Sequence, residues 1–259
     1  MSVVKSRDEV ALLVKFWNQT EGRDKFCKCL QYGCRGLAWL LMEEKDLAAR
    51  LSALYKTTAD SRKIFRLGKF LNEYLKLQQL FKSTDPQLDQ LSKSLNVLNR
   101  AAFFAYWVCD NLSILSKIKV IKGDTPKLAK RAFLFWFLAL VFGVLVELHK
   151  LQKNLDLQIQ LQQQQQQQQS AAAKKNSSDG GEGEGERATA ATSEALSKLG
   201  TERRNIALNI IKNCGDMITA GNGIELPHKI LGFGFNDGLI GLGGFVSAFI
   251  SCFQTYPAA

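Results

Sequence analysis

Apolar residues recur at helical spacing along much of the chain, and two stretches are apolar on every side. One apolar face recurs within residues 8–19, and a second amphipathic helix is predicted from residue 24 to about residue 42. Only 4 Pro interrupt a chain rich in Leu, Lys, Ala and Gln, a composition that favours helix over strand. The sequence therefore predicts an all-α fold: a helical integral membrane protein with amphipathic helices and one or two hydrophobic membrane segments.

The most pronounced amphipathic pattern lies between residues 60 and 82. On a continuous helix, one face carries bulky apolar groups, namely Ile64, Leu67, Leu71, Tyr74, Leu75 and Phe81. The opposite face is mostly cationic and carries Arg62, Arg66, Lys69, Glu73 and Lys76, with Lys63 and Phe70 on the flanks. Cations behind an aromatic-edged apolar face are typical of a helix that lies in an anionic membrane interface.

This pattern assigns two roles to the segment. The residues predicted to insert between lipid headgroups are Ile64, Leu67, Phe70, Leu71, Tyr74 and Leu75. The residues predicted to attract an anionic phospholipid bilayer are Arg62, Lys63, Arg66, Lys69 and Lys76.

Two further segments are candidate transmembrane helices. Residues 132–148 begin with a long uncharged run, would span about 25 Å as a helix, and have cations at both ends. Residues 230–253 are apolar apart from Asn236 and Asp237, and are rich in glycine. Small residues at helical spacing permit tight helix pairing in a membrane. We therefore predict self-association through Gly234, Gly238, Gly243 and Ser247.

The remaining segments connect these elements. Residues 1–131 form a basic helical region that includes the amphipathic helix, and residues 201–229 form another helix. Residues 149–200 are a linker rich in Gln, Gly and Glu that cannot build a core, and we expect it to be mostly disordered. Its run of glutamines could also extend the preceding helix.

The charge distribution indicates an anionic partner for the first half of the chain. The net charge is +10 in total. Residues 1–131 hold 24 Lys and Arg against 13 Asp and Glu, a net charge of +11, and residues 132–259 carry a net charge of −1. Such a basic half fits nucleic acid or an acidic membrane face. The cations lack the aromatic interleaving of a nucleic-acid reader, so no nucleic acid is predicted.

Catalytic and cofactor chemistry find little support in the residues. The chain has no GxSxG, P-loop or HExxH motif, so no enzyme is predicted. Its six cysteines include no CxxC pair and only two histidines accompany them, so neither a metal nor another cofactor is predicted. Asp110 and Asp237 lie within apolar stretches, where an acid is either functional or marks a helix break in the headgroup region.

Other functions fit parts of the pattern. A helix packed on a soluble core with its cations in water has the same periodicity, which would suit a soluble helical adaptor. A calmodulin-type target is a further interpretation of residues 60–82. A pore for small metabolites would need polar lining groups in the spans, and the candidates are Asn236, Asp237 and Asp110.

Several motifs resemble those of the peroxin-eleven family of peroxisomal membrane elongation and proliferation factors. The run TEGRDK at 20–25, followed by Gln31, Tyr32 and Arg35, resembles the N-terminal signature of that family. The run SRKIFRLGKFLNE at 61–73 resembles its membrane-remodelling amphipathic helix. Asp110-Asn111 and the glycine-rich C-terminus are also similar. The resemblance covers residues 1–150 and 200–259, and the glutamine-rich linker departs from it.

The resemblance implies a location and a function. It implies a non-enzymatic protein of the peroxisomal membrane whose N-terminal half faces the cytosol. It implies peroxisome elongation and proliferation by insertion of the basic helix into the cytosolic leaflet, with self-association as a homo-oligomer and recruitment of organelle fission machinery. Some family members are implicated in metabolite passage as pores. Two spans would return the C-terminus to the cytosol and place the linker in the matrix.

Overall fold

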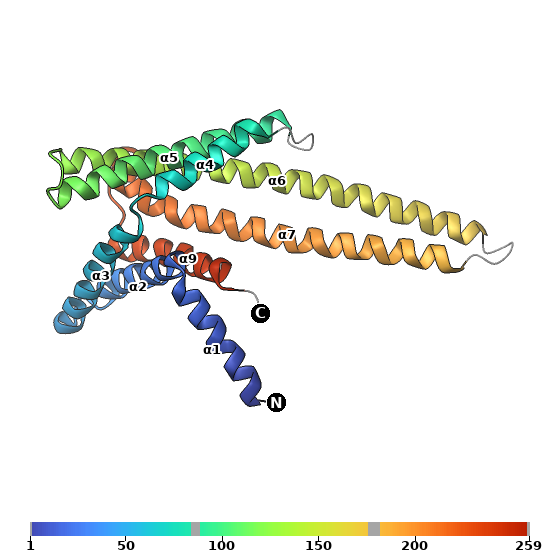
Figure 1. Cartoon of the computed structure of the whole chain (residues 1–259), viewed down its shortest axis with the longest axis horizontal. Coiled ribbons are helices and arrows are strands. Elements are labelled where there is room, and N and C mark those ends of the chain that lie inside the picture. Colours follow the sequence, from blue (N-terminus) through green and yellow to red (C-terminus); the bar gives the residue numbers. More distant parts are fainter. Residues whose placement is uncertain (1, 84–88, 176–181, 258–259) are drawn as a thin grey trace. The chain divides into compact units, whose positions relative to one another are not determined.

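The described residues of the computed structural model, 2–83, 89–175 and 182–257, fold almost entirely into helices and contain no strand (Figure 1). This confirms the all-α prediction. In order along the chain, the helices are α1 (Ser2–Asn18), α2 (Thr20–Leu40), α3 (Lys45–Phe65), α4 (Lys69–Lys82), α5 (Gln90–Lys117), α6 (Thr125–Lys175), α7 (Glu182–Gly223), α8 (Leu226–Leu231) and α9 (Asp237–Thr255).

The chain divides into two compact units. The larger comprises residues 1–144 and 211–259, and the smaller comprises residues 145–210. Within the smaller unit, segments of α6 and α7 pair through polar side chains. Asn154 Nδ2 donates to the carbonyl of Leu199 at 3.2 Å, and Arg203 Nε donates to Asn154 Oδ1 at 3.1 Å.

The linker predicted at residues 149–200 differs from the structure. Helix α6 continues through the glutamine run to Lys175, and α7 begins at Glu182. Residues 149–175 contain neither Gly nor Pro, and Gln is among the better helix formers, so nothing local ends the helix there. Residues 176–181, also part of the predicted linker, lie outside the described residues.

In the larger unit, α2 and α9 pack side by side as an antiparallel pair (Figure 1). Arg35 donates to Asp237 at 2.6 Å near the start of α9, and Cys29 Sγ lies 3.6 Å from Cys252 Sγ near its end. These two contacts fix the register of the pair. The first turn of α2 is therefore level with the end of α9.

Glycines set the separation of α2 and α9. A Cβ on Gly241 would lie 2.5 Å from Gly36 Cα, and a Cβ on Gly244 would lie 2.2 Å from the ring of Tyr32. Such distances leave no room for any side chain larger than hydrogen. Glycines on both helices thus bring the backbones of α2 and α9 into close contact.

The residues predicted for self-association face mostly into this packing. A Cβ on Gly238 would lie 2.3 Å from the ring of Trp39, and one on Gly243 would lie 2.8 Å from the carbonyl of Gly215. Ser247 is 0% exposed, whereas Gly234 lies exposed before α9. These small residues pack against α2 and α7. Their face of α9 is therefore covered and not open to a second copy in the described conformation.

Two described helices are long and apolar enough to cross a membrane, namely Thr125–Gln167 of α6 and Asp237–Thr255, which is α9. The first contains the predicted span 132–148. The second begins later than the predicted residue 230 because Asn236 caps α9, its Oδ1 accepting from Leu239 N at 2.8 Å. The outward face of α9 presents large apolar groups, namely Leu242, Phe249 and Phe253.

We expect Gly241→Ala to destabilise the larger unit by about 1–3 kcal/mol, since the added methyl meets the backbone of α2, which cannot rotate away. The measurement is the thermal unfolding midpoint of the purified protein in detergent. Gly200→Ala is the matched control because its Cβ would meet nothing within 4 Å. Equal midpoints for Gly241→Ala and the unchanged protein would contradict the close packing.

Candidate membrane-binding site

Residues 60–82 form two helices instead of the single helix predicted. Helix α3 ends at Phe65 and α4 begins at Lys69. Between them Gly68 takes a left-handed conformation with φ 78°, which glycine adopts without the cost that other residues incur. A side chain from α5 stabilises this break: Asn111 Oδ1 accepts from Gly68 N at 2.8 Å, and its Nδ2 donates to the carbonyl of Arg66 at 3.1 Å.

The apolar face of this segment points outward. Six of its side chains are between 42% and 71% exposed, namely Ile64, Leu67, Leu71, Tyr74, Leu75 and Phe81. Phe70 is only partly exposed, and its ring packs edge-on against Phe104 of α5 with centroids 6.3 Å apart. Five of the six residues predicted to insert are therefore exposed, as is Phe81.

The cations behind this face point into the protein, whereas the sequence predicts that they face lipid headgroups. Arg62 is 8% exposed and bonds Asp24 Oδ1 through Nε at 2.9 Å. Lys69 Nζ lies 2.8 Å from Glu21 Oε2. The cause is the pair of acids on α2, Glu21 and Asp24, which bind these cations within the protein.

The other predicted cations are paired as well, but less deeply. Arg66 lies 3.4 Å from Asp110. Lys63 pairs with Asp60 on its own helix. Lys76 bonds Glu73 at 2.7 Å while 48% of its side chain stays exposed. Of the five cations, Lys76 thus keeps the most surface for a headgroup.

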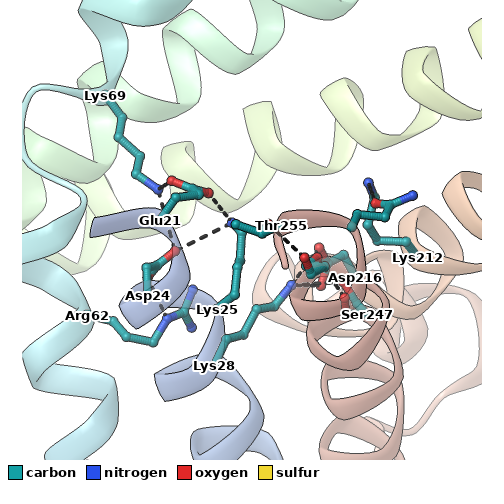
Figure 2. Close-up of polar contacts among 12 residues, drawn as sticks. Glu21, Asp24, Lys25, Lys28, Arg62, Lys69, Lys212, Asp216, Ser247 and Thr255 are labelled. Carbon is teal, nitrogen blue, oxygen red and sulfur yellow. Dashed lines mark hydrogen bonds and ion pairs between the residues drawn. The ribbon is translucent and has the colours of Figure 1, made fainter. Parts of the chain in front are cut away.

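Five charged residues of α2, α3 and α4 form what we call the ionic cluster: Glu21, Asp24, Lys25, Arg62 and Lys69 (Figure 2). Asp24 is its centre and is 1% exposed. Besides the bond to Arg62, its Oδ2 lies 3.5 Å from both Lys25 Nζ and Lys69 Nζ. The cluster joins the start of α2 to the end of α3 and the start of α4.

The cations determine the ionisation of the two acids. Burial by itself would raise the pKa of Asp24, but Arg62, Lys25 and Lys69 outweigh it and hold that pKa well below the ordinary value of 3.8. Burial likewise opposes ionisation of Glu21, and Lys25 and Lys69 lower its pKa. Both carboxylates are therefore charged at neutral pH.

A second buried pair connects α2 to α7 and α9. Lys28 Nζ lies 2.7 and 2.9 Å from the two carboxylate oxygens of Asp216 and donates to Ser247 Oγ at 2.8 Å (Figure 2). Breaking such a pair strands a buried charge, so the contact ties three helices together.

Sequence reasoning missed the physical role of this chemistry. The TEGRDK run served only as a family signature, although four charged residues of α2 recur at i, i+3, i+4 and i+7 spacing on one helical face. Such a face ordinarily points to water. The rest of the signature is also structural, since Gln31 accepts from Arg62 at 2.7 Å and Arg35 pairs with Asp237.

The polar residues considered for a pore have partners within the chain. Asp110 pairs with Arg66, Asn236 caps α9, and Asp237 pairs with Arg35 while 59% of its side chain stays exposed. Among the residues that the structure describes, no group of three His, Cys, Asp or Glu side chains is arranged to hold a metal ion.

The distribution of charged and apolar side chains departs from that of a water-soluble protein. Charged side chains such as Asp24, Lys28 and Arg62 are buried, while large apolar groups line the outside of α4 and α9. Buried charges and wide exposed apolar faces are the informative deviations from ordinary burial, and together they indicate a lipid surrounding. The fold and the site thus define an all-helical membrane protein.

The comparison with known proteins gives the family. Residues 10–256 match Peroxisomal biogenesis factor 11 (PEX11), and the chain belongs to this family. This confirms the resemblance read from the motifs.

Named relatives agree with the family. The chain is 28% identical over 252 residues to "Peroxisomal membrane protein 11 homolog" of Dictyostelium discoideum, covering 95% of this chain and 93% of the relative. It is 29% identical over 256 residues to "Peroxisomal membrane protein 11D" of Arabidopsis thaliana, covering 97% and 94%. It is 32% identical over 150 residues to "Peroxisomal membrane protein PMP27" of Saccharomyces cerevisiae, covering 56% and 60%. No solved structure matches the chain.

We expect Asp24→Asn to destabilise the protein by about 3–5 kcal/mol, because Arg62 would stay buried without a carboxylate. Denaturant unfolding of the purified protein in detergent measures the loss. Asp60→Asn, which removes an acid with 63% of its side chain exposed, is the control and should change stability by about 1 kcal/mol or less.

The loss of stability in Asp24→Asn should also depend on pH. The folded pKa of Asp24 lies below its unfolded pKa, so its contribution is complete above the ordinary carboxyl range and falls as the pH drops through the folded value. The stability gap between Asp24→Asn and the unchanged protein should therefore narrow below about pH 4. A gap that is absent at pH 7 would contradict the ionic cluster.

Proposed function

We propose that this protein resides in the peroxisomal membrane and remodels it, driving peroxisome elongation and proliferation. Its working surface is the outward apolar face of residues 64–81, which inserts into the cytosolic leaflet. One observation carries the proposal: this face is exposed to 42–71% per side chain while the charges behind it are bound within the protein. The family membership supports the membrane and the organelle.

Burial of this face in lipid supplies enough free energy to matter. Six bulky side chains, each about half exposed, would contribute on the order of 5–10 kcal/mol on entering an apolar medium. That is comparable to a single acyl anchor, which gives reversible membrane binding. The candidate spans of α6 and α9 would hold the protein in the bilayer. Insertion of the apolar face is then not needed for anchoring, and its effect is to expand one leaflet relative to the other.

Electrostatic attraction is the smaller term in the described conformation. Lys76 keeps half of its side chain exposed and Lys82 is exposed, and each cation near an anionic surface contributes about 1 kcal/mol. Arg62 and Lys69 are bound to acids of α2. Apolar insertion therefore dominates, and charge adds a preference for anionic lipid.

Self-association and recruitment of the organelle fission machinery belong to the same proposal. Both are what the resemblance of the sequence motifs to those of the family implies. The inward glycine row of α9 is occupied by α2 and α7, so the outward row is the better candidate for contact with a second copy. That row includes Leu242, Phe249 and Phe253.

Leu71→Glu in the full-length protein should abolish membrane tubulation, because a charge would replace the centre of the inserting face while the fold, which leaves Leu71 56% exposed, is undisturbed. The measurement is the number of tubules per liposome by electron microscopy after reconstitution into anionic liposomes.

The matched control is Asn72→Glu, which places the same charge at the next, exposed position off the apolar face. It should tubulate like the unchanged protein. Equal tubulation by Leu71→Glu and Asn72→Glu would overturn the proposed role of the face.

A further inference from the structure

The break at Arg66–Gly68 is not required by the local sequence. The apolar period runs through residues 60–82 without a proline, and glycine inside a helix costs only about 1 kcal/mol. A Cβ on Gly68 would also meet nothing within 4 Å, so no steric contact at that position forces the bend. The cause of the bend must therefore lie in contacts from elsewhere in the chain.

Asn111 supplies those contacts. In a continuous helix, the N–H of Gly68 would donate to the carbonyl of Ile64, and the carbonyl of Arg66 would accept from the N–H of Phe70. In the structure, the side chain of Asn111 bonds to that same N–H and that same carbonyl, at 2.8 and 3.1 Å. One buried amide on α5 thus bonds to two backbone groups that lose their helical partners at the break, while neighbouring groups form i→i+3 bonds, such as Lys69 N to the Arg66 carbonyl at 3.3 Å.

The ion pairs beside the break are incompletely satisfied. Arg66 lies 3.4 Å from Asp110, and among the described atoms Arg66 Nε and Asp110 Oδ2 are buried without a hydrogen-bond partner. An unpaired buried polar atom is unfavourable, so a better partner for Arg66 would release it from α5. On the other side of the break, Lys69 is bound to Glu21 at a partly exposed position.

We propose that Asn111 is a latch that holds residues 60–82 as two helices, and that anionic phospholipid headgroups open it by competing with Asp110 and Glu21 for Arg66 and Lys69. This inference rests on the proposed function and names the regulation of its inserting face. Opening lets Gly68 return to helical geometry. In the continuous helix, five inserting side chains then share an arc of about 100°, namely Ile64, Leu67, Leu71, Tyr74 and Leu75.

The latch accounts for the difference between sequence and structure at this segment. The periodicity of residues 60–82 describes the open, continuous helix, whereas the structure shows the closed, bent one. In the closed form the apolar face is divided between α3 and α4. In the open form it becomes one uninterrupted wedge, and Arg66 and Lys69 bind headgroups.

The experiment measures a distance across the break in the full-length protein. Unnatural-amino-acid spin labels replace exposed Lys56 and Gln79, which leaves the six native cysteines in place. A continuous helix would separate these positions by about 34 Å, and a bent one brings them closer. The protein is measured in neutral detergent, in phosphatidylcholine vesicles, and in vesicles that also contain phosphatidylserine.

The unchanged protein should show the shorter distance in detergent and in phosphatidylcholine, and the longer one once phosphatidylserine is present. Gly68→Ala penalises the left-handed residue and should shift the population toward the long distance by about 5- to 30-fold in detergent. Asn111→Ala should act in the same direction. Gly200→Ala, an unobstructed glycine of α7, is the control and should leave the distance unchanged.

Failure of the latch is distinguishable from failure of the proposed function. A short distance that persists on phosphatidylserine vesicles while they tubulate would overturn the latch and leave remodelling intact. A shift to the long distance without tubulation would support the latch and overturn the remodelling. An equal shift on phosphatidylcholine would overturn the headgroup competition. Gly68→Ala touches no neighbour, so it decides the matter even where Asn111→Ala fails to fold.

Discussion

The arrangement of the N-terminal helices depends on the ion pairs that the buried carboxylate of Asp24 forms. It bonds Arg62 of α3 directly and lies near Lys25 of its own helix and Lys69 of α4. An isolated buried charge would be strongly unfavourable, and three surrounding cations make it tolerable. This constraint turns the polar side of the end of α3 toward α2 and holds the first turn of α4 there, while the rest of α4 packs on α5. The apolar sides of both helices then face outward.

That orientation connects packing to function. In water, an outward row of Ile, Leu, Tyr and Phe on α4 would be an aggregation hazard, and in a bilayer it is the natural surface. Helix α9 follows the same rule, with glycine and serine toward α2 and α7 and phenylalanine outward. The glycine contacts permit the close approach, and the buried pair of Lys28 with Asp216 fixes which helices meet.

Much of the fold could be predicted from periodicity, because helical spacing and apolar length depend on local sequence. Periodicity and apolar length predict the all-α class, the apolar face from Ile64 to Leu75 and both candidate spans. The orientation of the cations was not, since nothing in a single helix shows that acids on α2 will face Arg62 and Lys69. The left-handed conformation of Gly68 could not be predicted either, because the side chain that stabilises it, Asn111, is 43 residues away in the sequence. Composition favours disorder for the glutamine run, and the alternative that it extends the preceding helix is the one that the structure shows.

The central claim is that the outward face of residues 64–81 contacts lipid. A nitroxide at position 75, in full-length protein reconstituted into liposomes, tests it by power saturation with two relaxing agents. Oxygen concentrates in the acyl region, and a nickel chelate stays in water. Collisions with oxygen that clearly exceed those with the chelate are the predicted result. Free access of the chelate, with little effect of oxygen, would show that this face points into water and would contradict the account.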